Sequence, residues 1–179
     1  MHSVLDAALR LFWENGFEAT SVDALTAAMG MSKSSFYGAF GSKQGVLLAA
    51  LQCYSDEVYA GWVRLAEEAG EGAPTALVHA LARPECGSRG CLFANIVSER
   101  GPHDDEVADL GRRHFARVET LLAGCLVGDA PEDAPLTARD RARALMALAF
   151  GAMILRKSGV VEDDIERALA QAERLIGER

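Results

Sequence analysis

The chain of 179 residues has no apolar run long enough to span a bilayer. It also lacks a basic segment followed by an apolar one near its start, which is the pattern of a secretory signal. These absences argue against membrane-spanning and exported proteins. Since half of the residues are hydrophobic, the chain can still bury a core for one or two small domains. We therefore expect a cytoplasmic protein with no membrane partner.

Cysteine is scarce, with four residues in the whole chain, which argues against a disulfide scaffold in a cytosolic protein. Cys86 and Cys91 have no second close pair of ligands, so their spacing fits no common zinc pattern. No nucleophile stands beside a base, and no paired carboxylates occur at a recognisable spacing. The sequence predicts no metal, no cofactor and no enzyme activity.

Acidic residues are missing from one long stretch, from Ala24 to Ser55. The chain as a whole has 26 Asp and Glu against 18 Lys and Arg, and a net charge of −8. Lys33 and Lys43 lie inside the acid-free stretch. A locally positive face on an acidic body can bind phosphate, while the body opposes loose, sequence-independent binding. This distribution favours a salt-dependent contact with nucleic acid.

The acid-free stretch and the residues just before it have the pattern of two short helices joined by a tight turn. Thr20 or Ser21 can cap the first helix, and Asp23 extends a capping-box pattern. Gly30 stands where a helix ends in a left-handed residue, and Ser32 can cap the second helix. An apolar stripe marks the first helix: Val22, Leu25 and Met29.

The second helix, from Lys33 to Phe40, separates two kinds of side chain. Phe36 and Phe40 share one face, and we assign both rings to the core. The opposite face keeps small, polar and cationic residues, which suit the major groove of DNA. Two helices joined through a glycine-containing turn form a helix-turn-helix, whose second helix enters that groove.

The run from Gly30 to Tyr37, GMSKSSFY, continued by Phe40 and Ser42-Lys43, resembles the N-terminal domain of TetR-family transcriptional regulators. The resemblance extends back over a helix from about Val4 to Asn15. It implies an all-α chain. An N-terminal three-helix, helix-turn-helix DNA-binding domain would occupy residues 1–45, and a helical ligand-binding and dimerisation domain residues 46–179.

The resemblance also implies which residues contact double-stranded DNA: Lys33, Ser34, Ser35, Tyr37 and Lys43. Tyr37 would bond a phosphate, and Lys43 would meet another beside a helix N-terminus. A packing role for Tyr37 and ordinary solvation of the two lysines stay open. Ala39 departs from the pattern, because many members have histidine there. Members often carry a basic arm before the first helix, so the arm is either absent here or precedes this numbering.

Helical periodicity predicts the elements that follow the motif. A long helix from Lys43 to about Ala69 would join the DNA-binding domain to the ligand-binding domain. The remaining predicted helices are Thr75 to Ala82, Cys91 to Glu99, Asp104 to Leu126, one that follows a capping pattern at Thr137 to Asp140, and about Val161 to Ile176. The resemblance implies that the last two pair with those of a second subunit, although packing within one chain stays open.

A homodimer of this kind would have two recognition helices about one helical turn of DNA apart, and would read a palindrome. A small-molecule effector that changes this separation would release the operator. Candidate pocket residues are aromatic or apolar side chains: Tyr54, Trp62, Phe93, Phe115 and Leu122. The polar candidates are Glu99, Arg100, His103 and His114. Core packing or surface exposure is the competing interpretation for each.

Cys91 is the candidate redox sensor. It follows Arg89-Gly90 and opens a predicted helix, and a nearby cation and a helix N-terminus both favour the reactive thiolate. Gly90-Cys91-Leu92 also resembles a segment of several TetR-type regulators, some of which sense electrophiles or oxidants. A buried structural cysteine is the alternative.

The main alternative to DNA binding is a helical interaction protein that uses the same motif for protein contacts. The acid-free stretch with its two lysines favours DNA. Failure to bind any duplex above nonspecific levels would favour the interaction protein.

Overall fold

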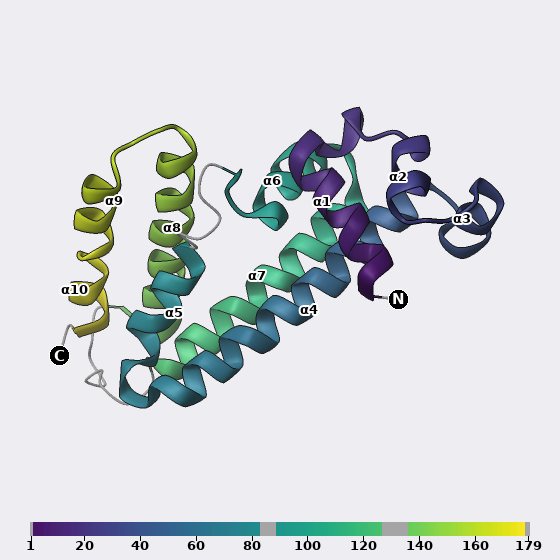
Figure 1. The fold of residues 1–179 in the computed structure, drawn as a ribbon. Coiled ribbons are helices and arrows are strands. Elements are labelled where there is room, and N and C mark those ends of the chain that lie inside the picture. Colours follow the sequence, from purple (N-terminus) through teal and green to yellow (C-terminus); the bar gives the residue numbers. More distant parts are fainter. Residues whose placement is uncertain (1, 83–88, 127–135, 178–179) are drawn as a thin grey trace. The chain divides into compact units, whose positions relative to one another are not determined.

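The computed structural model describes residues 2–82, 89–126 and 136–177 (Figure 1). These residues form helices and short connections with no strand, which confirms the all-α prediction. None of the helices in these ranges is long and apolar enough to cross a membrane. The elements are α1 (His2–Ala19), α2 (Val22–Ala28), α3 (Lys33–Phe40), α4 (Lys43–Ala69), η1 (Gly70–Gly72), α5 (Ala73–Ala82), α6 (Leu92–Arg100), η3 (Gly101–His103), α7 (Asp105–Cys125), α8 (Ala138–Lys157), α9 (Glu162–Leu169) and α10 (Ala172–Gly177).

The chain divides into two compact units. The first combines Met1–Val58 with Leu92–His114, and the second combines Tyr59–Cys91 with Phe115–Arg179. Helices α4 and α7 each contribute residues to both units. The predicted boundary between residues 45 and 46 lies inside α4, close to its start. Whether the functions divide at that point stays a prediction.

The first unit has a core of apolar side chains from α1, α2, α3, α4 and α6. On α1, α4 and α6 the buried members recur at helical spacing, as expected for helices that pack on one face. Among these core residues are Leu5, Ala8, Phe12, Leu25, Phe36, Leu47, Leu51, Phe93 and Ile96. The packing of α2 and α3 on this core fixes which face of α3 remains exposed.

Sequence patterns predicted several bounds in this unit. The structure confirms the helices from Lys33 to Phe40 and from Lys43 to Ala69 at both ends. In α1 the regular helix is interrupted at Gly16, one residue beyond its predicted end, where φ is 76° and ψ is 174°. That combination is open essentially only to glycine. The chain therefore turns sharply before it enters α2.

The second unit is built on α8, which contacts α5, α9 and α10. Thr137 and Asp140 form the predicted capping box at the start of α8. The buried guanidinium of Arg141 donates to the carbonyl oxygens of Leu126, at 3.2 Å, and Ile176, at 3.5 Å. These bonds satisfy carbonyl groups near the carboxyl ends of α7 and α10, which would otherwise lack partners.

The predicted final helix from Val161 to Ile176 is wrong in one respect, because it is two helices. α9 ends at Leu169, and α10 begins at Ala172. At the break, the Gln171 N–H donates to the carbonyl three residues earlier, at 3.1 Å, so the last turn tightens. No glycine or proline marks this position, and the buried residues keep helical spacing across it. The apolar pattern therefore gave no sign of the break.

Candidate nucleic-acid interface

The helix-turn-helix of α2 and α3 is capped at both starts. The Ser21 hydroxyl accepts the Ala24 N–H at 3.1 Å, and the Ser32 hydroxyl accepts the Ser35 N–H at 3.1 Å. Gly30, with φ of 65°, follows α2 in the left-handed conformation that was predicted for it. Thr20, the alternative cap, is buried instead and donates its hydroxyl to the Gly16 carbonyl at 2.7 Å.

Helix α3 has one buried and one exposed face. Phe36 is fully buried, and its ring centroid lies 5.4 Å from that of Tyr37 and 6.0 Å from that of Phe40. Tyr37 is 50% exposed although it is a large aromatic residue. The other exposed residues of this face are Lys33, Ser34, Ser35, Gly38 and Ala39. The structure thus brings four of the predicted DNA contacts together on one face of α3.

Lys33 has a partner that the sequence analysis did not identify. Its ammonium lies 2.5 Å from a carboxylate oxygen of Asp23, at the start of α2. The hydrogen bond to Asp23, together with the charge of Asp23, raises the pKa of Lys33. Asp23 is the last acidic residue before the acid-free stretch. Any contact between Lys33 and a phosphate would therefore compete with this exposed ion pair.

Lys43 lies at the start of α4, but its ammonium reaches back to residues 16–21, which run from the interruption of α1 at Gly16 to the start of α2 and are called the link. It donates to the carbonyl oxygens of Phe17, at 2.8 Å, and Thr20, at 3.0 Å. It also lies 4.2 Å from the centroid of the Phe17 ring. The ammonium of Lys43 is thus bonded to the backbone of the link, and its contact with phosphate stays a prediction.

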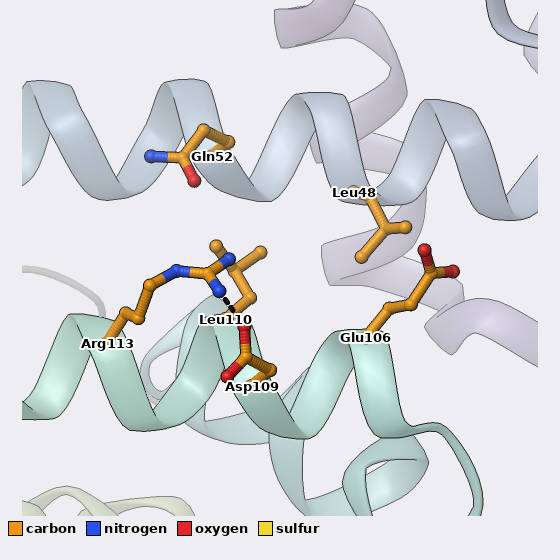
Figure 2. A pocket seen from close by; sticks show the side chains of 6 residues that line it. All are labelled: Leu48, Gln52, Glu106, Asp109, Leu110 and Arg113. Carbon is orange, nitrogen blue, oxygen red and sulfur yellow. Dashed lines mark ion pairs between the residues drawn. The ribbon is translucent and has the colours of Figure 1, made fainter.

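A groove of about 420 Å³ opens between α4 and α7 within the first unit (Figure 2). Leucines and charged residues line it together: Leu48, Gln52, Glu106, Asp109, Leu110 and Arg113. Arg113 already pairs with Asp109, and Glu106 accepts a bond from Gln44 at 3.3 Å. Arg113 and Asp109 of this groove thus bind each other, and Glu106 is bonded by an amide from outside the lining.

A smaller groove of about 180 Å³ lies in the same unit, and Tyr54 lines it. The Tyr54 ring meets the Trp13 ring edge-on, with 6.2 Å between centroids. The other lining residues are Asp6, Leu9, Arg10, Glu57 and Leu92. Of the predicted pocket residues, Phe93 also belongs to the first unit, whereas Trp62, Phe115 and Leu122 belong to the second. A role of any of them in effector binding stays a prediction.

The polar candidates for effector binding are mostly engaged within the first unit. His114 is buried, its Nδ1 lies 2.7 Å from the Ser55 hydroxyl, and its ring stacks on Phe93 at 4.1 Å. Glu99 bonds to the backbone of Phe17 and Arg100 to the side chain of Glu18, both in the link. His103 is exposed in η3.

Cys91 lies directly before α6, after Gly90 in the left-handed conformation, so its predicted place at a helix start is confirmed. It is 5% exposed. Its role as a redox sensor stays a prediction. Burial raises the pKa of the thiols of Cys53 and Cys125, which disfavours their reactive form.

Some predictions fall on parts of the chain that are not described. One is the prediction that Cys86 belongs to no zinc site, because residues 83–88 lie outside the described ranges. Across the described ranges, no three His, Cys, Asp or Glu side chains are grouped as they would be to hold a metal ion.

Comparison with known proteins gives this fold its context. Residues 4–50 match the family described as bacterial regulatory proteins, tetR family. An uncharacterized HTH-type transcriptional regulator of Bacillus subtilis (strain 168), YezE, is 30% identical over 125 residues, which cover 66% of this chain and 62% of the relative. The HTH-type transcriptional repressor ComR of Escherichia coli (strain K12) is 30% identical over 126 residues, 66% of this chain and 60% of ComR. The chain thus spans about three fifths of the length of these curated relatives.

Solved structures share the fold over nearly the whole chain. The reduced form of NemR from E. coli has a TM-score of 0.84 at 19% identity, and covers 97% of this chain and 95% of its own. The CifR cysteine mutant, solved with 26-bp double-strand operator DNA, has a TM-score of 0.77 at 25% identity, with 99% and 95% covered. The fold and the capped motif are those of a helix-turn-helix protein. Residues 4–50 belong to the N-terminal domain of the TetR family, which confirms the predicted resemblance.

Proposed function

We propose that this chain is a repressor that binds a palindromic operator as a homodimer in the cytoplasm and leaves the operator when a small-molecule effector binds. The observation that carries the proposal is the exposed face of α3. This face is polar and cationic, and it lies in a stretch without acidic residues. The opposite face of α3 is anchored in the core by the buried Phe36.

The amino end of α3 is suited to contact the major groove. Lys33, Ser34 and Ser35 form its exposed first turn, where backbone amides carry partial positive charge. Their short hydroxyls and one long cation can reach base edges or the nearest phosphates. Tyr37 presents its hydroxyl one turn later and can donate to a phosphate. In the CifR structure, a protein of the same fold is bound to operator DNA.

The second unit offers a surface for a second copy of the chain. Four large apolar residues near the carboxyl end of α8 and the start of α9 are exposed: Ile154, Leu155, Val160 and Val161. Ile154 and Val161 are 66% and 65% exposed. Grouped apolar residues of this kind are unfavourable in water and favour an interface. A two-fold axis through the two C-terminal helical segments would bury the same patch on both subunits.

Release by an effector requires a difference in its affinity for two states of the protein. Helix α4 supports this proposal because one continuous helix supplies residues to both units. An effector that binds beside α4, or a modification of the Cys91 thiol, could shift the helix that follows the DNA-binding motif. The names of two structural relatives mention a reduced form and mutated cysteines, which supports testing thiol reagents as well as small molecules.

The test is fluorescence anisotropy of the purified protein with a labelled duplex from its own upstream intergenic region, and with a scrambled duplex as control. We expect tight, salt-sensitive binding to the native duplex at two chains per duplex. Equal and weak binding to both duplexes would contradict the proposal, and would favour a protein-interaction role or a distant operator. Once binding is found, displacement by candidate effectors and by thiol reagents tests the release step.

A further inference from the structure

The link, residues 16–21, follows the interruption of α1 at Gly16 and is bound by charged side chains from distant parts of the first unit. Its two N–H groups after the Gly16 turn point to the carboxylate of Glu99, near the end of α6. The Phe17 N–H donates to both oxygens of Glu99, at 3.1 and 3.2 Å, and the Glu18 N–H donates to one of them at 3.3 Å. Successive N–H groups of this kind form a concave site for an anion.

Gly16 is required at this site for two reasons. Its backbone conformation, with φ of 76°, strains any residue that carries a Cβ. In addition, a Cβ at this position would lie 3.2 Å from Oε2 of Glu99. The carboxylate of Glu99 can therefore lie this close to the backbone because residue 16 is glycine and has no Cβ.

Two cations hold the same link from other elements. Lys43, at the start of α4, donates to the carbonyl oxygens of Phe17 and Thr20, and its ammonium lies 4.2 Å from the Phe17 ring centroid. The Arg100 guanidinium lies 4.6 Å from the same centroid. Cations at these distances are attracted to an aromatic ring. The N–H groups of the link thus face an anion, while its carbonyl groups and its ring face cations.

Arg100 extends this contact to the start of α7. Its guanidinium lies 2.7 Å from Glu18 and 3.4 Å from Asp104. Asp104 in turn accepts the N–H groups of Glu106 and Val107, both at 3.2 Å, and so caps α7. Burial alone would raise the pKa of Asp104, but the bonds from the Val107 N–H and the Gln44 side chain, together with Arg100, lower it.

We propose that Glu99 and Arg100 are positioning residues for operator recognition, which fix the orientation of the helix-turn-helix through the link that precedes α2. This inference rests on the proposed operator binding. Neither side chain touches DNA in this proposal. They act through residues 16–18, three residues before α2 begins at Val22. A displacement of the end of α6 would then change the presentation of α3 while its DNA-contacting residues remain intact.

The contact is not fully satisfied. Nε of Arg100 is buried and has no hydrogen-bond partner among the described residues. A buried donor without an acceptor costs free energy, which offsets part of what the other bonds contribute.

The test compares the wild-type protein with Glu99→Gln, which keeps the size of the side chain and removes its charge. The matched control is Glu67→Gln, at an exposed glutamate in the second unit. We expect Glu99→Gln to weaken operator binding about tenfold, because charge-assisted hydrogen bonds are lost. Binding to a scrambled duplex should stay within about twofold and keep its salt slope, since the phosphate contacts are unchanged. Hydrogen exchange at the Phe17 and Glu18 amides should accelerate.

Three outcomes would overturn the inference. One is unchanged operator affinity in a folded Glu99→Gln protein whose Phe17 and Glu18 amides exchange faster, which is what a purely stabilising role gives. Another is an equal loss on both duplexes. The third is wild-type protein that does not discriminate the operator at all, which shows that the proposed function itself has failed. If Glu99→Gln does not fold, Arg100→Lys takes its place with the same expected pattern, because lysine keeps the charge but cannot bond to two carboxylates in the geometry of a guanidinium.

Discussion

The two connections on either side of α2 are stabilised in different ways. The turn after α2 uses local signals, because Gly30 adopts the left-handed conformation and Ser32 caps a residue three positions later. The link before α2 depends on distant side chains, and Glu99 lies 82 positions from Phe17. The first connection can be read from a few consecutive residues, whereas the second exists only once the unit has folded. Mutations on the two sides should therefore have different effects.

The largest difference is expected between the two glycines. Gly16→Ala should lower the free energy of unfolding by about 3 kcal/mol, because the strained backbone conformation and the approach to Glu99 act together. Gly30→Ala should cost only about 1 kcal/mol, since nothing lies within 4 Å of a Cβ there and only the left-handed conformation is unfavourable. Urea denaturation of each variant measures these values. Gly38→Ala, in open space on α3, is the control and should not destabilise the protein.

The two lysines should separate stability from DNA binding. Lys43→Gln should lower the free energy of unfolding by about 1 to 2 kcal/mol, because bonds from a charged group to the link are lost. Lys33→Gln should leave the melting temperature nearly unchanged and reduce the salt slope of operator binding by about 1, the value for one phosphate contact. Thermal denaturation and anisotropy at several salt concentrations test both. If Lys33→Gln loses stability and keeps the salt slope of operator binding, then Lys33 stabilises the fold and does not contact a phosphate.

The local turn can be weakened without any change in the link. Ser32→Ala removes the cap of α3 and should cost about 1 kcal/mol. The amides at the start of α3 should exchange faster, while those of Phe17 and Glu18 keep their protection, because no charged group of the link is altered. Hydrogen exchange read at single residues distinguishes the two regions. Equal acceleration at both would show that they open as one.

The smallest effect is expected from acid. The pKa of Asp104 is lowered in the folded protein, so its contribution to stability is complete above the ordinary aspartate range and is lost as the pH falls below it. As Asp104 is protonated, Arg100 loses a charged partner, and protection at Phe17 and Glu18 should fall once intrinsic exchange rates are taken into account. Gly30 and Ser32 do not titrate, so the turn should keep its protection. In Asp104→Asn this pH dependence of the link should be reduced.

The sequence predicted the parts of the site that depend on neighbouring residues. The caps of α2 and α3, the buried Phe36 and the exposed polar face of α3 all follow from spacing over at most one or two turns. The partner of Lys43 could not be predicted in this way, because its carbonyl acceptors lie 23 and 26 positions earlier and leave no periodic pattern. Glu99 and Arg100 were predicted as effector contacts, and no local feature indicated that they bind the link after Gly16.

The contact between Phe17 and Glu99 also bears on how the protein is made. A chain leaves the ribosome from its amino end, and its domains generally fold as they emerge. Here α1, α2 and α3 are synthesised first, but Glu99 and Arg100 follow more than half way along the 179 residues. Until they emerge, the backbone N–H groups of Phe17 and Glu18 lack their acceptor. The segment that is encoded first is therefore completed only after residues past the midpoint of the chain have been translated.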